Sequence, residues 1–521
     1  METEDAIDKY DEIIHHDARN GYQISLEAYL KHKPECLNRF YQFGESKWTI
    51  LIAACYFQHE AIVRMLVNQF NVDVEAEGTI VMNTRDTGHT TIERVTPLWV
   101  AAAVNNLNIV KFLVQFGRAN VNHLTEERST PFRAACYNGN IEMAKFLVHH
   151  GANPHRVRLN NYTNLTLAIL NGYTNLVHYL VDDLKCDINQ EDVDGQTALH
   201  TAVEYNNILT ARFLIDHGAL NLRDKSRNLT PLMLAAVQGK TRYVTAFDGH
   251  CSDIDWIEAH ELLGSSFAGC LAGTENMNTA VEYFTLAFEA RTAKNIPKLC
   301  SQQTSAVFDH RQESETLQDL NQLVSFGSRE NFYIEALLIQ ERILGTGSKF
   351  YHESLRNIGY RLMDIHQYEL CFRLWFYELD LRRQRRIPFE RDDLRWFVNL
   401  CEELFSANQM ETYINQFCTL LSIMTETLST PQDNETFDFN LVTLSHLVTI
   451  SAELLLTEHS DDRPKLSLEN SKILFKHIRS IVRKDYATKD SGASLLHLCC
   501  TEDTTSPLNL FRYVLELESF P

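Results

Sequence analysis

Two groups of histidine and cysteine residues are the places where this sequence could hold a metal ion. His149 and His150 are adjacent, and His497 stands just before Cys499 and Cys500. Adjacent side chains on a helix point in different directions, and the second group has no further ligand pair at the spacing of a zinc site. We therefore predict no metal site and no cofactor.

The short motifs of common catalytic sites are also missing from the sequence. It contains no G-x-x-x-x-G-K-[ST] loop for phosphates, no G-x-S-x-G nucleophile turn and no H-E-x-x-H zinc motif. We expect no catalytic residues and a protein that is not an enzyme. We therefore expect the protein to function by binding, through a surface whose position is set by its secondary-structure elements.

A recurring Thr-Pro-Leu-x-x-Ala-Ala pattern, or a close variant, is the strongest signal for those elements. Its copies begin at Thr49, Thr96, Thr130, Thr163, Thr197 and Thr230. From Thr96 onward the intervals are 34, 33, 34 and 33 residues. A period of 33 residues headed by this pattern is typical of ankyrin repeats. We therefore predict an all-α protein whose first part is an ankyrin-repeat solenoid.

Each part of the pattern has a physical role in a pair of helices. The threonine hydroxyl can cap the first helix, and proline suits its first turn because it has no N–H to lose. The second helix should end at a glycine such as Gly117, Gly151 or Gly218, where a left-handed residue costs little. His200, at a repeat head, is expected to be structural. Residues 5–33 resemble a degenerate first helix pair.

The interval from Thr49 to Thr96 is longer than the others. It measures 47 residues, 14 more than the 33-residue period, and the surplus falls between Asn71 and Thr96. Insertions in such arrays form loops on one face, which is often the binding face. A surface insertion without a function is the alternative.

The repeat period is lost near residue 249, and helical patterns continue. We predict three domains: the ankyrin repeats in 1–248, a helical domain resembling tetratricopeptide (TPR) pairs in 249–485, and the start of a second, truncated ankyrin block in 486–521. The last block rests on Ser494-Leu-Leu-His497, which looks like another repeat head.

Charge and cysteine usage narrow the partners and the compartment. The formal charge of −21 repels phosphate backbones and anionic lipids, so we expect neither nucleic acid nor a membrane as a partner. Twelve cysteines are scattered without a C-x-x-C pair, which fits reduced thiols. No basic, apolar leader follows Met1. A cytoplasmic location, or the nucleus, is expected.

The order of several segments resembles the Fem (feminization-type) family of ankyrin proteins. Ser129-Thr-Pro-Phe-Arg-Ala-Ala-Cys-Tyr-Asn-Gly-Asn140 looks like that family's STPLRAACFDGH. Glu258-Ala-His-Glu-Leu-Leu-Gly-Ser-Ser-Phe267 is similar to its ALELLGASF, and Ala336-Leu-Leu-Ile-Gln-Glu-Arg-Ile-Leu-Gly345 to its ALLIRERILG. The resemblance runs in order over nearly the whole chain.

Membership would imply a substrate-recognition subunit of a cullin-RING ubiquitin ligase of the cullin-two type. In that family the ankyrin groove captures the carboxyl-terminal tail, or C-degron, of a target protein, often one ending in arginine. A later box binds elongin B/C and the cullin. That box is missing from these 521 residues, so we expect ligase partners only if a longer form exists.

The resemblance also suggests which residues meet the tail. Trp99 would form an apolar wall, Tyr137 would stack on a side chain, and three polar residues would contact the peptide end: Ser129, Arg133 and Asn138. Asn138 replaces a family acid, and the family's FDGE loop is replaced by residues 82–89, whose only acid is Asp86. Asp86 is the sixth candidate for a contact with the tail, because its carboxylate could restore a charge-assisted hydrogen bond. A preference for terminal arginine is therefore in question. Packing between repeats is the alternative role for Trp99 and Arg133, and a scaffold without a ligase is the alternative function.

Overall fold

The computed structural model of the chain describes residues 4–84, 88–270, 276–298, 306–326, 328–387, 394–429, 434–456, 466–482, 484 and 486–487. Asp86 and nearly all of the predicted second ankyrin block, with His497, Cys499 and Cys500, lie outside them. The chain forms two compact units: Met1–Phe267 with Asn276–Lys298, and Ala268–Glu275 with Leu299–Pro521. Each is described by itself.

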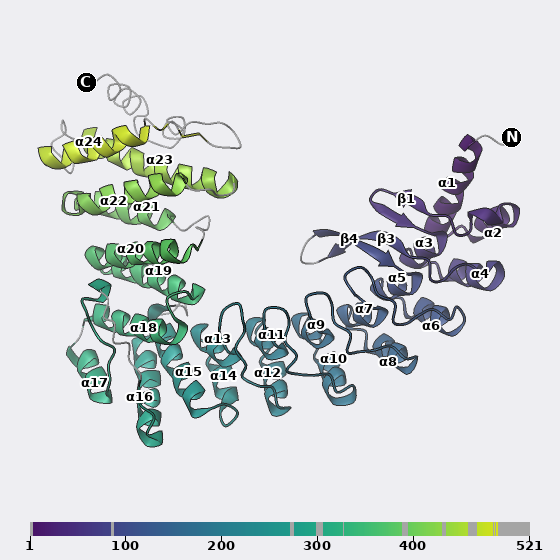
Figure 1. The fold of residues 1–521 in the computed structure, drawn as a ribbon, viewed down its shortest axis with the longest axis horizontal. Coiled ribbons are helices and arrows are strands. Elements are labelled where there is room, and N and C mark those ends of the chain that lie inside the picture. The colour runs from purple at the N-terminus through teal and green to yellow at the C-terminus, as the bar shows by residue number, and fades with distance from the viewer. Residues whose placement is uncertain are drawn as a thin grey trace. The chain divides into compact units, whose positions relative to one another are not determined.

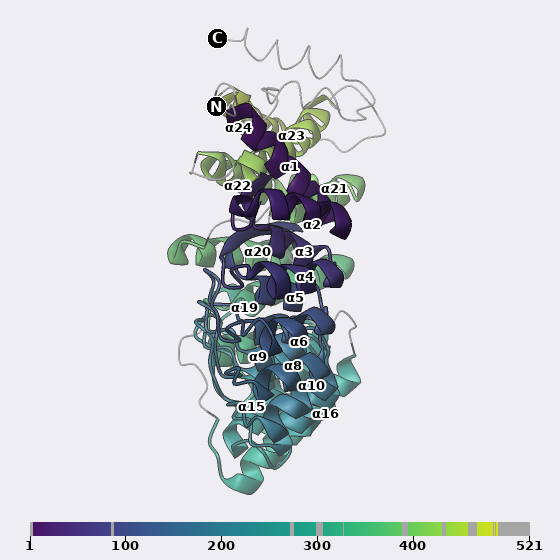
Figure 2. The ribbon, with the colours of Figure 1, turned by 90° about the vertical axis from the view of Figure 1, so that its right-hand side faces the viewer.

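The first unit contains the predicted stack of helix pairs (Figure 1). A degenerate pair, α1 (Glu4–Asn20) and α2 (Gln23–His32), comes first. The inner helices of the following repeats are α3 (Ile50–Tyr56), α5 (Pro97–Ala103), α7 (Pro131–Tyr137), α9 (Asn164–Leu170), α11 (Ala198–Glu204) and α13 (Pro231–Val237). The outer helices are α4 (Glu60–Phe70), α6 (Leu107–Gln115), α8 (Ile141–His149), α10 (Thr174–His178), α12 (Ile208–Asp216) and α14 (Thr241–Val244). Figure 2 shows α6, α8 and α10 following one another along the stack.

The predicted threonine caps are confirmed at the start of the inner helices. The hydroxyl accepts a hydrogen bond from the N–H three residues on at Thr49, Thr96, Thr130, Thr163 and Thr230. At Thr197 the imidazole of His200 takes part instead: its Nδ1 accepts the Thr197 N–H at 3.1 Å, and its Nε2 bonds Leu229 O at 3.1 Å. His200 is fully buried and structural, as expected.

The helix stops follow the prediction at two of the three glycines. Gly151 and Gly218 adopt the left-handed conformation, with φ of 90° and 88°. The prediction was wrong at Gly117, because the left-handed residue there is Arg118, with φ of 55°. Gly117 serves close packing instead, since a Cβ at this position would lie 2.7 Å from Leu113 O.

The expectation of an all-α protein was wrong in two segments, the one before α3 and the insertion before the second capped repeat. A four-stranded antiparallel sheet forms in the order β1 (Tyr41–Phe43), β2 (Ser46–Trp48), β3 (Gly78–Thr84) and β4 (Gly88–Val95). The surplus residues make most of the β3–β4 hairpin, which is rich in threonine, isoleucine and valine. These β-branched side chains favour extended backbone over helix.

Two features hold this hairpin at its base. Arg94 donates two hydrogen bonds to the carboxylate of Glu77, at 2.9 and 3.1 Å. Gly78 lets β3 approach β2 closely, because a Cβ there would come within 2.7 Å of Lys47 O. The insertion is therefore a fixed wall beside α5, and its Met82 and Ile92 side chains belong to the groove described below.

The first unit continues beyond the last repeat. Helices α15 (Asp253–Ser265) and α16 (Met277–Lys294) pack on each other, and α15 packs on α13. A buried, two-pronged ion pair joins them: Arg291 Nε and Nη2 donate to the carboxylate of Glu261 at 2.9 and 3.0 Å. The predicted boundary at residue 248 marks the loss of the 33-residue period, whereas the compact unit extends to Lys298.

The second unit is helical over the part of the chain that the structure describes. Its helices are α17 (Leu317–Phe326), α18 (Arg329–Leu344), α19 (Lys349–Asp364), α20 (Tyr368–Arg385), α21 (Arg395–Ser406), α22 (Met410–Leu428), α23 (Asn434–Leu456) and α24 (Leu468–Val482). Neighbouring helices pack as pairs, including α19 on α20 and α21 on α22. Their likeness to TPR pairs stays a prediction.

Buried charges inside the second unit are paired with each other. Glu378 accepts a hydrogen bond from Arg382 Nε at 2.6 Å, and Arg356 Nη1 and His352 Nδ1 lie 3.5 and 3.3 Å from the same carboxylate. Burial raises the pKa of Glu378, but the hydrogen bond from His352 and the charge of Arg382 outweigh it, so that the net pKa is lowered.

No helix among the described residues has the length and hydropathy needed to cross a bilayer.

Candidate functional site

A groove of about 540 Å³ lies in the ankyrin unit, and four of the six predicted site residues line it. Trp99 comes from α5, Ser129 from the loop before α7, and Arg133 and Tyr137 from α7 itself. The far wall is built from the loop before α9 and from α9, and the near wall from the β3–β4 hairpin. Consecutive repeats thus bring together side chains that are about one period apart in sequence.

The near half of the groove is held by a link between two repeats. The indole Nε1–H of Trp99 donates to Ser129 Oγ at 3.2 Å, and the Ser129 N–H donates to Thr125 Oγ1 at 3.0 Å. Trp99 is only 5% exposed, so most of its ring packs between repeats. Trp99 also lines the groove, and its role as an apolar wall for a peptide stays a prediction.

Arg133 is the most unusual side chain of the site. It is 7% exposed, and its Nη1 donates to Tyr162 O at 2.8 Å and to Asn164 Oδ1 at 3.4 Å. Nε and Nη2 have no acceptor among the described residues, and no ion pair between described residues includes Arg133. Burial, together with repulsion from Arg158, lowers the pKa of Arg133 to about 10, so the group stays charged near neutral pH.

A second arginine and a glutamate complete the charged part of the groove. Arg158 forms an ion pair with Glu127, and the side chains of the two residues are 39% and 43% exposed. They occupy the loops before α9 and α7, 31 residues apart, so stacking of the repeats creates the pair. The groove therefore contains two arginines and one carboxylate among its described residues.

Asn138 makes contacts that differ from those expected of it. Its Nδ2 donates to Ala102 O, Ala103 O and Ala134 O, at 3.0, 3.0 and 3.2 Å, and so bridges the end of α5 to α7. Carbonyls at a helix end lack partners within the helix, which explains why an amide is useful here. Its role in contacting a peptide stays a prediction, and Asp86 lies outside the described residues.

Several groove residues were missed from the sequence. Glu127, Arg158 and Tyr162 stand in the loops between repeats, and Tyr205 follows α11 with 58% of its surface exposed. Their loops vary in composition and match no motif. Aligning the loops on the threonine heads would have placed Glu127 and Arg158 near equivalent positions of successive repeats and suggested their pairing.

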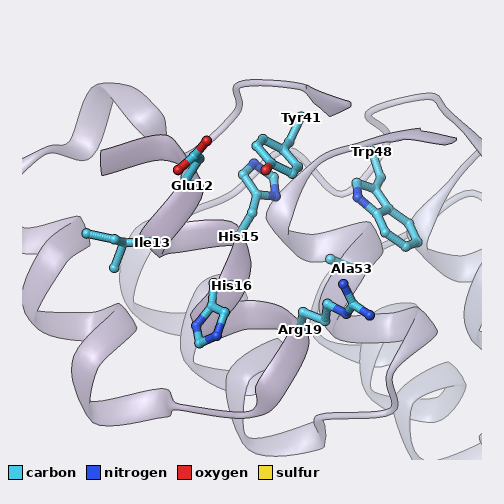
Figure 3. A pocket seen from close by; sticks show the side chains of 8 residues that line it. All are labelled: Glu12, Ile13, His15, His16, Arg19, Tyr41, Trp48 and Ala53. Carbon is cyan, nitrogen blue, oxygen red and sulfur yellow. The ribbon is translucent and has the colours of Figure 1, made fainter. Parts of the chain in front are cut away.

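A second hollow of about 370 Å³ lies at the amino-terminal end of the stack (Figure 3). The His15 imidazole stacks on the Tyr41 ring, with centroids 4.5 Å apart, and Arg19 and Trp48 lie across the hollow. It contains none of the residues predicted from the sequence. Within the described ranges, no three histidine, cysteine or acidic side chains converge as metal ligands would.

Comparisons with known proteins agree with the repeat pattern and with the family resemblance. The ankyrin repeat family (three copies) matches residues 79–158 and 165–247. The chain is similar to protein fem-1 homolog A-like of Mus musculus, with 28% identity over 47% of this chain and 42% of that protein. Protein fem-1 homolog A of Homo sapiens is 25% identical over 63% of this chain and 56% of its own length.

A zebrafish relative and one solved structure also match the chain. Protein fem-1 homolog A of Danio rerio is 30% identical over 34% of this chain and 29% of its own length. Among solved structures, the ankyrin repeat domain of Bcl-3 aligns with 42% of this chain and 92% of its own, at 19% identity and a TM-score of 0.35.

The matched part spans about two fifths of the length of the first mouse relative and just over half of the human one. The ankyrin match at 79–158 and 165–247 includes the repeats that build the groove. From the repeat heads, the capped inner helices and these relatives, we conclude that the chain is an ankyrin-repeat protein related to the fem-1 homologs.

Proposed function

We propose that this protein is a substrate-recognition subunit of a cullin-RING ubiquitin ligase, and that its ankyrin groove binds the carboxyl-terminal tail of target proteins. The observation that carries the proposal is the groove itself, where Trp99, Ser129, Arg133 and Tyr137 converge on one cavity. A cavity of about 540 Å³ has the size of a site for a few residues of extended chain.

The chemistry of these residues suits a chain end. A free α-carboxylate needs donors, and Arg133 has two guanidinium nitrogens without an acceptor in the part of the chain that the structure describes. Charge-assisted hydrogen bonds from a guanidinium to a carboxylate are among the stronger polar contacts in proteins. The rings of Trp99 and Tyr137 supply flat apolar surface beside it.

The ligase part of the proposal rests on the relation to the fem-1 homologs. Elongin B/C and a cullin-two type scaffold are the partners we propose for it. An ankyrin scaffold that holds a target without delivering it to a ligase is the second candidate, because the repeats and the hairpin build the groove by themselves.

Tail capture is tested by comparing peptides with a free and an amidated carboxyl terminus. Randomised octapeptide pools, fluorescently labelled at the amino end, are titrated with the intact chain and followed by polarisation. Amidation removes the charge that Arg133 would meet, so we expect affinity to fall by about thirtyfold or more. Equal binding of both forms would contradict tail capture.

Ligase recruitment needs a separate measurement. Tagged chain, and any longer product of the same coding sequence, are expressed in cells and purified, and the co-purifying proteins are probed for elongin B/C and the cullin. Recovery with either form supports the receptor role. If neither form recovers them while peptides still bind, the scaffold alternative holds.

A further inference from the structure

We infer that the groove selects tails whose last residue is uncharged and apolar, with the free α-carboxylate bound by Arg133, and that it discriminates against a terminal arginine. This inference rests on the proposed function and narrows the substrate class. It follows from the distribution of charge and apolar surface in the groove.

Arg133 is a buried cation that forms no ion pair with any residue that the structure describes. Its guanidinium is held on one edge by Tyr162 O and Asn164 Oδ1, and Asn164 is itself fixed because its Nδ2 donates to Pro154 O at 2.7 Å. The remaining nitrogens belong to a groove-lining side chain, and neither is among the fully enclosed atoms that lack a partner. A desolvated charge is costly unless paired, so an incoming carboxylate gains an uncommonly favourable partner.

Arg158 makes the surroundings unfavourable for a second cation. It is close enough to Arg133 that repulsion between the two contributes to lowering the Arg133 pKa. Its own charge is balanced by Glu127, the one carboxylate among the described lining residues. A terminal arginine would place a third guanidinium in the groove. Glu127, the one carboxylate among the described lining residues, is already paired with Arg158. Like charges brought together without water are strongly disfavoured.

Apolar and aromatic side chains make up a large share of the remaining lining, beside the polar Thr90, Thr125, Ser129 and Asn160. Leu167 and Leu170 of α9 form the far side, Met82 and Ile92 of the hairpin form the near side, and the exposed ring of Tyr205 lies at one end. An aliphatic or aromatic last side chain can bury its surface against these groups. An acidic side chain would face the carboxylate of Glu127 and apolar walls.

Counting charges favours one class of ligand. The described lining residues include two arginines and one glutamate, which leaves one positive charge, and a chain end with a neutral side chain contributes one negative charge. The bound state is then neutral. A terminal arginine would leave the site with a net positive charge, and a terminal aspartate with a net negative one.

The first experiment ranks the last residue. Octapeptide pools with seven randomised positions carry Leu, Phe, Arg or Asp at the end, each as free acid and as amide, and are titrated with the intact chain. We expect the Leu and Phe acids to bind about tenfold more tightly than the Arg and Asp acids. All amides should bind poorly.

The outcomes separate this inference from the function on which it rests. If the Arg acid pool binds best and amidation abolishes its binding, tail capture stands and the inference is overturned. If the Asp acid pool binds best, the charge argument fails while tail capture stands. If no pool binds, or if amidation changes nothing, tail capture itself is overturned.

A charge-altering variant tests the physical cause. Arg158→Gln removes one cation and releases Glu127, so the affinity for the Arg acid pool should rise by at least about fivefold while the Leu acid pool changes little. The matched control is Lys111→Gln, because Lys111 and Glu142 form an exposed pair between neighbouring repeats at 2.8 Å, outside the groove. An unchanged ranking in Arg158→Gln, or the same shift in Lys111→Gln, would overturn the charge explanation.

Discussion

Arg133 and Arg291 are two buried arginines of the same compact unit with opposite surroundings. Their exposed fractions are 7% and 8%. Arg291 holds the carboxylate of Glu261 with two hydrogen bonds, inside the packing of α15 on α16. Arg133 binds only a backbone carbonyl and an amide oxygen among the described residues, at the floor of a groove.

Under the proposed function, Arg291 carries a structural charge and Arg133 a binding one. A buried ion pair with complete hydrogen bonding stabilises one packing arrangement and strongly resists the loss of either partner. A buried cation that lacks its anion is a cost to the free protein that a ligand can offset. Burial alone does not distinguish the two arginines, and the lack of a carboxylate partner among the described residues is what favours a binding role for Arg133.

Breaking the paired site should have the largest effect. Glu261→Gln leaves Arg291 buried without a carboxylate, and we expect the free energy of unfolding to fall by about 3–5 kcal/mol. Urea unfolding measures the loss, and hydrogen–deuterium exchange should locate it at α15 and α16. Glu60→Gln is the control, because the Glu60–Arg64 pair is exposed and should contribute no more than about 1 kcal/mol.

Removing the unpaired cation should produce the opposite pattern. In Arg133→Met the hydrogen bond to Tyr162 O is lost but no carboxylate is orphaned, so unfolding should change by only about 1 kcal/mol. Binding of the Leu acid pool should nevertheless weaken by about thirtyfold or more. If the variant were instead destabilised as strongly as Glu261→Gln, Arg133 would be a packing residue. Its contrast with Arg291 would then be wrong.

Asn138→Asp tests whether this position is part of the groove or of the frame around it. An aspartate cannot donate to the three carbonyls that Nδ2 now contacts, so we expect a loss of about 1–3 kcal/mol in stability. Asn171→Asp is matched, since the equivalent amide one repeat later donates to a single carbonyl, Leu167 O. A smaller loss at Asn138 than at Asn171 would contradict the bridging role.

The smallest effect should come from a buried group that is neutral. Burial lowers the pKa of His200 from its usual value of 6.5, despite the hydrogen bond to Leu229. Above pH 6.5 the imidazole is neutral in both states and contributes no pH dependence. As the pH falls below 6.5 the unfolded chain binds the proton first, so the stability of the ankyrin unit decreases.

His200→Gln isolates that contribution, because glutamine can accept from the Thr197 N–H and donate to Leu229 O but does not titrate. Thermal unfolding of both proteins between pH 7 and about pH 5 measures it. The variant should show the flatter profile. Parallel profiles would mean that His200 does not titrate differently in the two states.

The fold of the repeats could be predicted because its signals are local. A threonine cap acts within the first turn of its own helix, and the 33-residue period exposes each copy to the same test. The sheet was missed because β3 and β4 lie in the insertion that interrupts the period, and β1 and β2 lie before the first repeat head at Thr49. Gly117 was misassigned because the neighbouring Arg118 took the left-handed position.

The candidate site was predictable only in part. Trp99, Ser129, Arg133 and Tyr137 stand in or beside repeat heads, where the period places them on one face. Asn138 turned out to hold backbone carbonyls, which depends on how α5 and α7 stack. Arg158 and Glu127 come from loops that match no motif, so only an alignment of these loops on the repeat heads could have suggested their pairing.

The sequence by itself determined the ankyrin repeats, their caps and the relation to the fem-1 homologs. Each of these depends on residues that are close together in sequence or that recur at a fixed period. Only the tertiary structure decided the electrostatics of the groove. Whether Arg133 meets a carboxylate, and whether Arg158 stands free or beside Glu127, depends on which side chains meet across neighbouring repeats. Charge–charge energies vary steeply with distance and burial, and a period in sequence specifies neither.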